Sequence, residues 1–409
     1  MAKRGIEALG QLSGKRALVR VDFNVPLREE GGQVVVADDY RLEMSLPTIR
    51  KLLERRARVV LCSHLGRPKK KGDPKLSLAP VARRLEALLR GSDGGGTKVK
   101  FHGECTGEKA ERLTTDELFP GEVLLLENLR YEEGEQKGDP EFGQALARLG
   151  DVYVNDAFGV SHRPDASVAQ LPALLPAAAG ELVKTEVERL QPLRDGTAAR
   201  PYVVILGGAK LSDKIPVLEA LIPKVDAVFV GGGMAYTFLK AMGKPIGKSR
   251  CDDELQQKAL EILELARERS RETGRELLLP RDHVVSSSPD DLNGYAVVDT
   301  IPDGLMGLDI GPQSIADFAK RLRDVKTVFW NGPLGVFEKK PFHLGTHYVA
   351  SVLAYTQQIH CVVGGGDSAA ATRELGLEAH MDWVSTGGGA SLEYVQGESL
   401  PGIEALPEA

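Results

Sequence analysis

The stretch YVVILGGAKLSDK, residues 202–214, shows the pattern that decides the fold: an apolar run over 203–206 ends in glycine and leads into a helical pattern. An unbroken apolar run is typical of a strand that is covered on both faces of a parallel sheet. Glycine at its end lets backbone N–H groups approach a ligand, and the following helix points its positive N-terminal end at the same place. The stretch therefore predicts an α/β fold that binds anions at its strand ends.

The same apolar runs recur along the chain, separated by helical patterns such as 80–89 and 253–271. Alternating strands and helices predict the α/β class, with doubly wound parallel sheets. The further predicted strands are 16–22, 59–63, 99–101, 123–126, 152–155, 227–230, 277–279, 327–330, 360–363 and 383–385.

The length of 409 residues predicts two domains, because single hydrophobic cores stop growing at roughly 250 to 300 residues. A helical stretch over 181–193 is followed by RDGTAARP, residues 194–201, where turn residues cluster near the middle of the chain. We expect a first domain over 1–180, an interdomain helix and hinge over 181–201, and a second domain over 202–392.

Composition excludes several classes of protein. Apolar residues make up 42% and charged residues 27%, and the 52 basic and 58 acidic residues give a net charge of -6, which argues against binding of nucleic acid through a basic face. No apolar stretch approaches the roughly 20 residues of a membrane span, and the first residues lack the apolar core of a signal peptide. Four scattered cysteines without CxxC spacing indicate reduced thiols. We expect a cytoplasmic protein without membrane or nucleic-acid partners.

Five strand exits in the second half carry glycine. One such glycine is more often only a tight turn, but five together favour a phosphate-binding domain, because open α/β sheets bind ligands at the carboxyl ends of their strands. Neither GxxxxGK[ST] nor GxGxxG spacing occurs, which disfavours P-loop enzymes and simple dinucleotide dehydrogenases. Lys210 and Lys214 lie either near transferring phosphates or on a helix surface. The exits are LGGAKLSDK (206–214), VGGGMA (230–235), WNGPLGVFE (330–338), VGGGDSAAA (363–371) and STGGGASLE (385–393).

Strand exits in the first half carry cations instead, in RVDFN (20–24), SHLGRP (63–68), LLENLRY (125–131) and NDAFGVSHRPDAS (155–167). One arginine alone is more often a solvated surface residue. Repeated placement favours a site for a small, multiply charged anion, since guanidinium groups match carboxylate and phosphate oxygens. Two domains that bind anions in different ways imply group transfer between two ligands. The residues expected at this rim are Arg41, His64, Arg67, Arg130, His162 and Arg163.

Ten motifs, in order over about residues 5–400, resemble the phosphoglycerate kinase family. The resemblance implies a phosphotransferase that moves the acyl phosphate of 1,3-bisphosphoglycerate to MgADP, giving 3-phosphoglycerate and MgATP. It also implies a monomer with two Rossmann-like domains joined by a helical hinge, and a C-terminal segment, 393–409, that returns to the first domain. The motifs are RVDFNVPL, SHLGRP, LLENLRY, GDVYVNDAFG, GGAKLSDKI, GGGMAYTF, LDIGP, WNGPLGVFE, GGGDSAAA and STGGGASLE.

The same resemblance implies roles for individual residues. Around the phosphoryl group in transfer it places Arg41, Lys210, Gly366 and Gly388, and it makes Asp367 the Mg²⁺ ligand. For the 3-phosphoglycerate site it implies Asp22, Asn24, Arg41, His64, Arg67, Arg130 and Arg163. For ATP or ADP it implies Lys214, Gly307, Glu338, Gly365, Gly366, Asp367 and Ser368.

The residue types suit this chemistry. A carboxylate nucleophile is already ionised at pH 7, because its pKa lies near 4, so the transfer needs no general base. The remaining task is to neutralise negative charge, which calls for Arg, Lys, Mg²⁺ and helix N-termini.

Two alternatives use parts of the same pattern. A two-domain protein that only binds a phosphorylated metabolite would need the arginines but not Lys210, Asp367 or Glu338. Another acyl-phosphate kinase would lack RVDFN and HLGRP.

The chain departs from the family at HRPDAS, residues 162–167, where HRAHAS is common. We expect the Asp165 carboxylate to point away from a bound glycerate, because a like charge would oppose the arginines.

Overall fold

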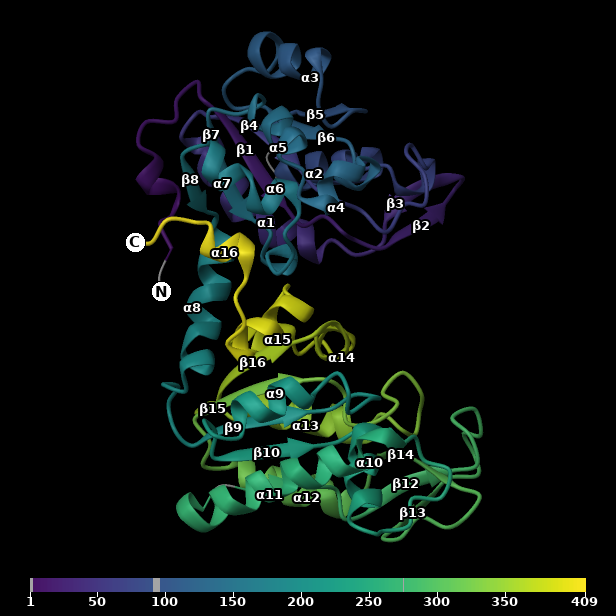
Figure 1. Cartoon of the computed structure of the whole chain (residues 1–409). Helices are drawn as coiled ribbons and strands as arrows, with labels where there is room; N and C mark the ends of the chain where they lie inside the picture. Colours follow the sequence, from purple (N-terminus) through teal and green to yellow (C-terminus); the bar gives the residue numbers. More distant parts are fainter. Residues whose placement is uncertain (1–2, 91–95, 275) are drawn as a thin grey trace. The chain divides into compact units, whose positions relative to one another are not determined.

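The structure, a computed structural model, describes residues 3–90, 96–274 and 276–409. The chain divides into two compact units, Met1–Glu188 with Ser399–Ala409, and Arg189–Glu398. Each unit is built around its own six-stranded parallel sheet (Figure 1). The predicted α/β class with two parallel-sheet domains is therefore confirmed.

The sheet of the first unit has the strand order β5-β6-β4-β1-β7-β8. β1 lies in the middle, and its Arg20 is in register with Cys62 of β4 and Asn155 of β7. The continuous apolar runs are buried, as their pattern predicts. The strands are β1 (Arg16–Val21), β4 (Arg58–Cys62), β5 (Val99–His102), β6 (Val123–Leu126), β7 (Val152–Asp156) and β8 (Ala177–Ala179).

Helices cover this sheet, and a two-stranded hairpin, β2 (Leu27–Glu30) with β3 (Gln33–Val36), extends from it (Figure 1). The hairpin turn uses Gly31 and Gly32, whose φ angles of 57° and 76° are the left-handed values that a two-residue turn requires. The helices are α1 (Tyr40–Glu54), α2 (Ala79–Arg90), α3 (Glu108–Arg112), α4 (Glu133–Lys137), α5 (Pro140–Ala147), α6 (Ala166–Ala169), α7 (Leu171–Leu174) and α16 (Pro401–Glu404). Helix α8 (Glu181–Asp195) begins in this unit, and its residues from Arg189 onward belong to the second unit.

The C-terminal segment belongs to this first unit. Gly402 N–H donates to Ser161 O at 2.9 Å, and Asn155 Nδ2 donates to Gly402 O at 2.9 Å. The C-terminal segment is thereby bonded to β7 and to the loop after it. The same loop carries His162 and Arg163, two of the predicted site residues.

The sheet of the second unit has the order β11-β10-β9-β15-β16-β17. A separate antiparallel sheet has the order β13-β12-β14, and its strands lie between β11 and β15 in the sequence. The strands of the large sheet are β9 (Tyr202–Leu206), β10 (Ala227–Val230), β11 (Glu276–Leu278), β15 (Thr327–Asn331), β16 (His360–Gly364) and β17 (Trp383–Val384). Those of the small sheet are β12 (His283–Ser286), β13 (Ala296–Val298) and β14 (Met306–Ile310).

The core of the second unit surrounds Trp330, which is fully buried. None of the helices in the described ranges is long and apolar enough to cross a membrane. The helices of this unit are α9 (Ile215–Leu221), α10 (Met234–Ala241), α11 (Gln256–Thr273), α12 (Pro312–Leu322), α13 (Leu344–Tyr355), α14 (Gly366–Glu374) and α15 (Gly389–Gln396).

Candidate functional site

In the first unit, the predicted anion-binding residues follow four strands that are neighbours in the sheet, β6, β4, β1 and β7. Their carboxyl ends therefore meet along one edge, where open α/β sheets place ligands. Arg41 joins them from the first turn of α1. The residues after the strands are Asp22 and Asn24 (β1), His64 and Arg67 (β4), Arg130 (β6), and His162 and Arg163 (β7).

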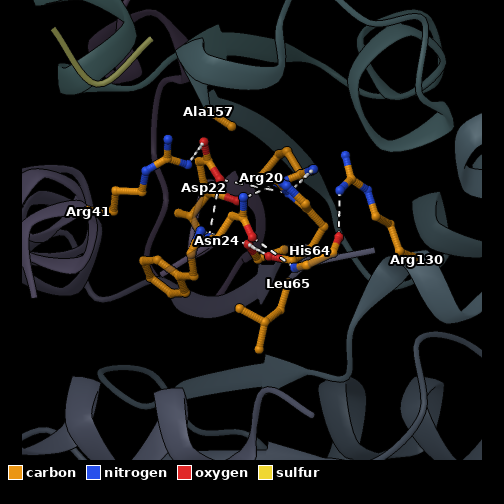
Figure 2. Close-up of polar contacts among 12 residues, drawn as sticks. Arg20, Asp22, Asn24, Arg41, His64, Leu65, Arg130 and Ala157 are labelled. Carbon is orange, nitrogen blue, oxygen red and sulfur yellow. Dashed lines mark hydrogen bonds and ion pairs between the residues drawn. The ribbon is translucent and has the colours of Figure 1, made fainter. Parts of the chain in front are cut away.

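Asp22 is the centre of this cluster (Figure 2). Its Oδ2 accepts a hydrogen bond from Arg41 Nη1 at 2.5 Å, and its Oδ1 lies 3.7 Å from His64 Nδ1. Burial acts to raise the pKa of Asp22, but the positive charge of Arg41, with that of Arg20, outweighs it and lowers the pKa below its usual value. The carboxylate is therefore ionised and fixes the guanidinium of Arg41.

His64 is held in one protonation state. Arg20 Nη2 lies 3.3 Å from His64 Nδ1, and because arginine only donates, Nδ1 must accept. Burial and the positive charge of Arg20 lower the pKa of His64 well below its usual value, although Asp22 opposes them. The ring is therefore neutral, with its proton on Nε2, and can donate one hydrogen bond to an anion.

A buried support that the sequence did not single out lies behind His64. Arg20 is fully buried, donates to Ser167 Oγ at 2.8 Å and lies 3.9 Å from the buried Glu135. Glu135 in turn accepts hydrogen bonds from Ser167 N–H at 3.0 Å and Ser167 Oγ at 2.5 Å. The available signal was the charge of Arg20 within an apolar strand, since a buried arginine needs partners.

Arg130 and Asn24 both contact the loop after β4. Arg130 Nη1 donates to Gly66 O at 2.6 Å, and Asn24 Oδ1 accepts from Gly66 N–H at 2.8 Å. Burial and the charge of Arg163 lower the pKa of Arg130, which Asp165 partly offsets. Asp165 is itself buried, with no hydrogen-bond partner for its Oδ2 in the described structure. Its orientation toward a bound ligand stays a prediction.

The last two predicted residues of this cluster are less constrained. Arg67 is exposed and has no hydrogen bond or ion pair with any described residue. Arg163 is half-buried, and its Nε lies 3.3 Å from His162 Nε2. Both guanidinium groups can therefore take a ligand without first losing a carboxylate partner.

In the second unit, glycine-bearing loops follow β10, β9, β15, β16 and β17, which are again neighbours in the sheet. Lys214 donates a hydrogen bond to Asn331 Oδ1 at the end of β15. Burial lowers the pKa of Lys214, while Asp213 and Asp367 oppose that shift. Lys210, four residues earlier, is exposed and has no partner among the described residues.

A cavity of about 370 Å³ brings three predicted nucleotide residues together, Gly307, Glu338 and Asp367. Gly307 has to be glycine, because a Cβ atom there would lie 2.0 Å from Tyr236 Oη. Tyr236 and Arg250 also line this cavity. Neither residue was predicted from the sequence, because nothing in their local pattern distinguishes them from structural residues.

The N-terminus of α14 carries the remaining predicted residues. Gly365 is the N-cap and Gly366 the first residue, and a Cβ atom at Gly366 would meet nothing within 4 Å. The first N–H groups of a helix have no partner inside it and favour anions. The Ser368 side chain is buried and accepts from Gly332 N–H at 2.6 Å, so its hydroxyl supports the loop after β15. Gly388 is the N-cap of α15.

Asp367 suits a magnesium ion that is shared with phosphate groups. It lies in the first turn of α14, is exposed, and has no hydrogen bond or ion pair with a described residue. No cluster of three metal-binding side chains exists in the described ranges. Mg²⁺ is commonly bound through one or two carboxylates together with substrate phosphates, so this single carboxylate fits the ion.

Comparison with known proteins identifies the family of the chain. A family model described as phosphoglycerate kinase matches residues 6–398. The chain is 50% identical to the phosphoglycerate kinase of Anaeromyxobacter dehalogenans and 48% identical to that of Moorella thermoacetica, with the whole of each chain covered.

Solved structures give the same result. The phosphoglycerate kinase structure from Coxiella burnetii superposes with a TM-score of 0.84 at 37% identity, and that from Pyrococcus horikoshii with a TM-score of 0.80 at 30% identity; each comparison covers 98% of both chains. This chain belongs to the phosphoglycerate kinase family.

Proposed function

We propose that each unit holds one of two substrates, and that the chain transfers the acyl phosphate of 1,3-bisphosphoglycerate to MgADP, giving 3-phosphoglycerate and MgATP. As a member of its family the chain is a phosphotransferase. The match of the family over residues 6–398 is the observation that carries this proposal. A binding protein without chemistry is not favoured, because the relatives are named as kinases over their full length.

The cluster around Asp22 is the proposed 3-phosphoglycerate site. Neutral His64 would donate its Nε2 proton to an anionic oxygen, and Asp22 would keep Arg41 in position. Arg67, Arg130 and Arg163 would bind the negative oxygens of the substrate, since guanidinium groups match phosphate and carboxylate geometry. Asn24 would act through the loop that carries Gly66, whose N–H it accepts.

The cavity in the second unit is the proposed nucleotide site. Gly307 and Glu338 line it. Lys214 and the first N–H groups of α14, from Gly365 to Ser368, would bind phosphates, because helix N-termini favour anions. Ser368 would contribute through its backbone, as its hydroxyl is already bonded to Gly332 N–H.

Catalysis would rest on charge neutralisation. In the direction that consumes ATP, the attacking carboxylate needs no general base. We assign Arg41, Lys210 and the N–H groups of Gly366 and Gly388 to the phosphoryl group in transfer, where preorganised donors lower the barrier. Asp367 would hold Mg²⁺, which when bound neutralises charge on the phosphates.

Transfer between substrates held by different units requires the units to close, and we assign the hinge to α8 and the loop to residue 201. Closure would also exclude water from the acyl phosphate. We further propose a cytoplasmic monomer. Four cysteines that form no disulfide support a reducing compartment.

The test is turnover of purified protein with 3-phosphoglycerate and MgATP, measured beside glycerate and acetate as control acceptors. We expect turnover with 3-phosphoglycerate only, because the arginines of the first unit need a phosphate to bind. Binding of both substrates without turnover would instead favour the binding protein.

A further inference from the structure

Arg250 is a charged residue of the nucleotide cavity that the mechanism above does not use. It lines the same cavity as Gly307, Glu338 and Asp367. Its side chain is exposed and forms no hydrogen bond or ion pair with any described residue. A guanidinium without a protein partner at the wall of a ligand cavity is available to the ligand.

The backbone around Arg250 is fixed on both sides. Ser249 Oγ accepts a hydrogen bond from Gly307 N–H at 2.9 Å. Asp252 Oδ2 accepts from Leu211 N–H at 2.7 Å, and Asp252 N–H donates to Thr237 Oγ1 at 3.0 Å. These bonds tie the segment to β14, to the loop after β9 and to α10, so Arg250 is presented from a defined backbone position.

The anchor to β14 indicates which part of a nucleotide Arg250 meets. The groups assigned to phosphates are Lys214, which follows β9 as the N-cap of α9, and Asp367, which follows β16 in the first turn of α14. β14 instead supplies Met306, Gly307 and Leu308 to an apolar part of the wall. Apolar walls accommodate a base ring, while a few polar groups at the edge determine which base is accepted. Arg250 directly follows Ser249, whose hydroxyl is hydrogen-bonded to Gly307 in this apolar wall. The backbone of Arg250 therefore lies beside the proposed base site.

The chemistry of a guanidinium selects among purines. Arginine offers donors only. Guanine presents two neighbouring acceptors, O6 and N7, whereas adenine presents N7 beside an amino donor, and a bidentate arginine contact to O6 and N7 is the commonest specific contact to guanine. A charged fork at the edge of the base therefore matches a 6-oxopurine better than adenine.

We propose that Arg250 binds the O6 and N7 edge of a 6-oxopurine, so that it raises the use of guanine nucleotides relative to adenine nucleotides at this site. The proposal rests on the proposed function of the cavity as the nucleotide site. It makes Arg250 a specificity-determining residue, and it leaves the assigned phosphate contacts unchanged.

The test compares initial rates with MgATP, MgGTP and MgITP, at saturating 3-phosphoglycerate, for the wild type, Arg250→Leu and Arg250→Lys. The matched control is Lys248→Leu, which removes a nearby exposed charge that does not line the cavity. We expect Arg250→Leu to lower the ratio of kcat/KM for GTP to that for ATP by about 10-fold, the size of one bidentate base contact. ITP should follow GTP, because it keeps O6 and N7.

Arg250→Lys should also lose most of this ratio, because lysine keeps the charge but not the planar fork. Lys248→Leu should leave the ratio unchanged. An unchanged ratio in Arg250→Leu would overturn the proposal. Equal losses with ATP and GTP would overturn it as well, since they would place the guanidinium on ribose or phosphate.

Failure of the proposed function gives a different result, namely no turnover of any nucleotide by the wild type. Calorimetric titration with MgADP and MgGDP then still decides the role of Arg250. A lower GDP to ADP affinity ratio in Arg250→Leu would support base recognition, and an unchanged ratio would overturn it. A thermal midpoint close to that of the wild type confirms that each variant is folded.

Discussion

The Asp22 and Arg41 pair shows how single residues in this chain combine structural and chemical tasks. Asp22 is nearly fully buried, and its pKa stays low because the guanidinium groups of Arg41 and Arg20 lie beside it. Arg41 is the most exposed member of this group, with 30% of its side chain accessible. Its guanidinium is therefore oriented from inside by a carboxylate while its outer face remains free for a ligand.

Arg41→Ala is expected to lower kcat by about 10² to 10³, with a smaller change in the KM for 3-phosphoglycerate. The reason is that a donor used mainly in the transition state contributes roughly 3 to 4 kcal/mol there. Steady-state kinetics check this, with Arg28→Ala as the control, because Arg28 is exposed and pairs with Glu30 on the hairpin. A nearly normal kcat in Arg41→Ala would contradict the assignment of Arg41 to the phosphoryl group in transfer.

The two lysines of the second unit should behave differently. Lys210→Ala is expected to lower kcat as Arg41→Ala does, because its exposed ammonium has no partner among the described residues and is assigned to the transferring phosphate. Lys214→Ala should mainly raise the nucleotide KM. Lys214 is held in place by Asn331 and is assigned to the phosphates of the bound nucleotide, so its contact is already made before the transfer. Kinetics with varied MgATP separate the two effects. Loss of kcat in Lys214→Ala alone would show that the two roles are reversed.

His283 makes the second unit sensitive to acid. Burial lowers its pKa from 6.5 to about 4, against the charge of Asp282, and Lys244 and Asp299 also act on it. The unfolded chain therefore binds a proton near pH 6.5 that the folded chain binds only near pH 4, so stability rises with pH between these values. From pH 7 to pH 5 this costs about 2 kcal/mol of unfolding free energy.

Denaturant unfolding at pH 7 and pH 5 tests this expectation. His283→Gln cannot protonate, so it should lose about 2 kcal/mol less than the wild type over this range. His360→Gln serves as control, since His360 is partly exposed beside Asp382. Equal losses in the wild type and His283→Gln would assign the acid sensitivity to other groups.

At the scale of elements, continuous apolar runs were enough to predict every strand of the two parallel sheets except β8. The antiparallel strands β12 and β14 and the edge strand β13 were not predicted. β13 is mostly exposed, and the segment between β12 and β13 is rich in Ser, Asp and Pro, so no apolar run marks them. β8 consists of three alanines, which carry no β-branched signal.

Helix α14 gives a prediction at this scale. Gly366→Ala should leave the free energy of unfolding equal to that of the wild type or slightly higher, because a Cβ atom there meets nothing within 4 Å and alanine favours helices. It should raise the nucleotide KM about 10-fold or more, because the methyl group would occupy the space assigned to phosphate and weaken a hydrogen bond to a charged group.

The measurement is nucleotide affinity together with denaturant unfolding of the same variant. Gly103→Ala is the matched control, since a Cβ atom there also meets nothing within 4 Å and the residue lies in the first unit. Unchanged affinity in Gly366→Ala would mean that phosphate does not approach this end of α14.

The residues of the candidate site that could be predicted from the sequence are those that directly follow a strand. Arginine and glycine at strand exits pointed to two anion sites, and the sheet order places those exits on neighbouring strands in each unit. The support formed by Arg20, Glu135 and Ser167 could not be predicted, because its members are far apart in sequence and meet only through the packing of α4 and α6 near β1. Arg250 could not be predicted either, because nothing in the sequence around it distinguishes it from a solvated surface arginine.

For the whole molecule, the decisive property is that the two proposed substrate sites belong to different compact units. Each unit has its own core and its own sheet edge, so each can bind its ligand independently of the other. Phosphoryl transfer, however, needs the reacting atoms within about 3 to 3.5 Å. We therefore predict that the activity includes a closing motion that neither binding site needs by itself.

We predict that 3-phosphoglycerate alone and a MgATP analogue alone leave the protein incompletely compacted, and that both together compact it fully. The reason is that each ligand contacts one unit, so only the pair gains interactions that favour the closed state over the open one. Small-angle scattering of the free, singly bound and doubly bound protein gives the radius of gyration in each state. Arg41→Ala and Lys210→Ala should weaken this compaction if both residues reach the same phosphoryl group. A radius of gyration that does not change on binding both ligands, in protein that still turns over, would contradict closure and with it the assignment of α8 as the hinge.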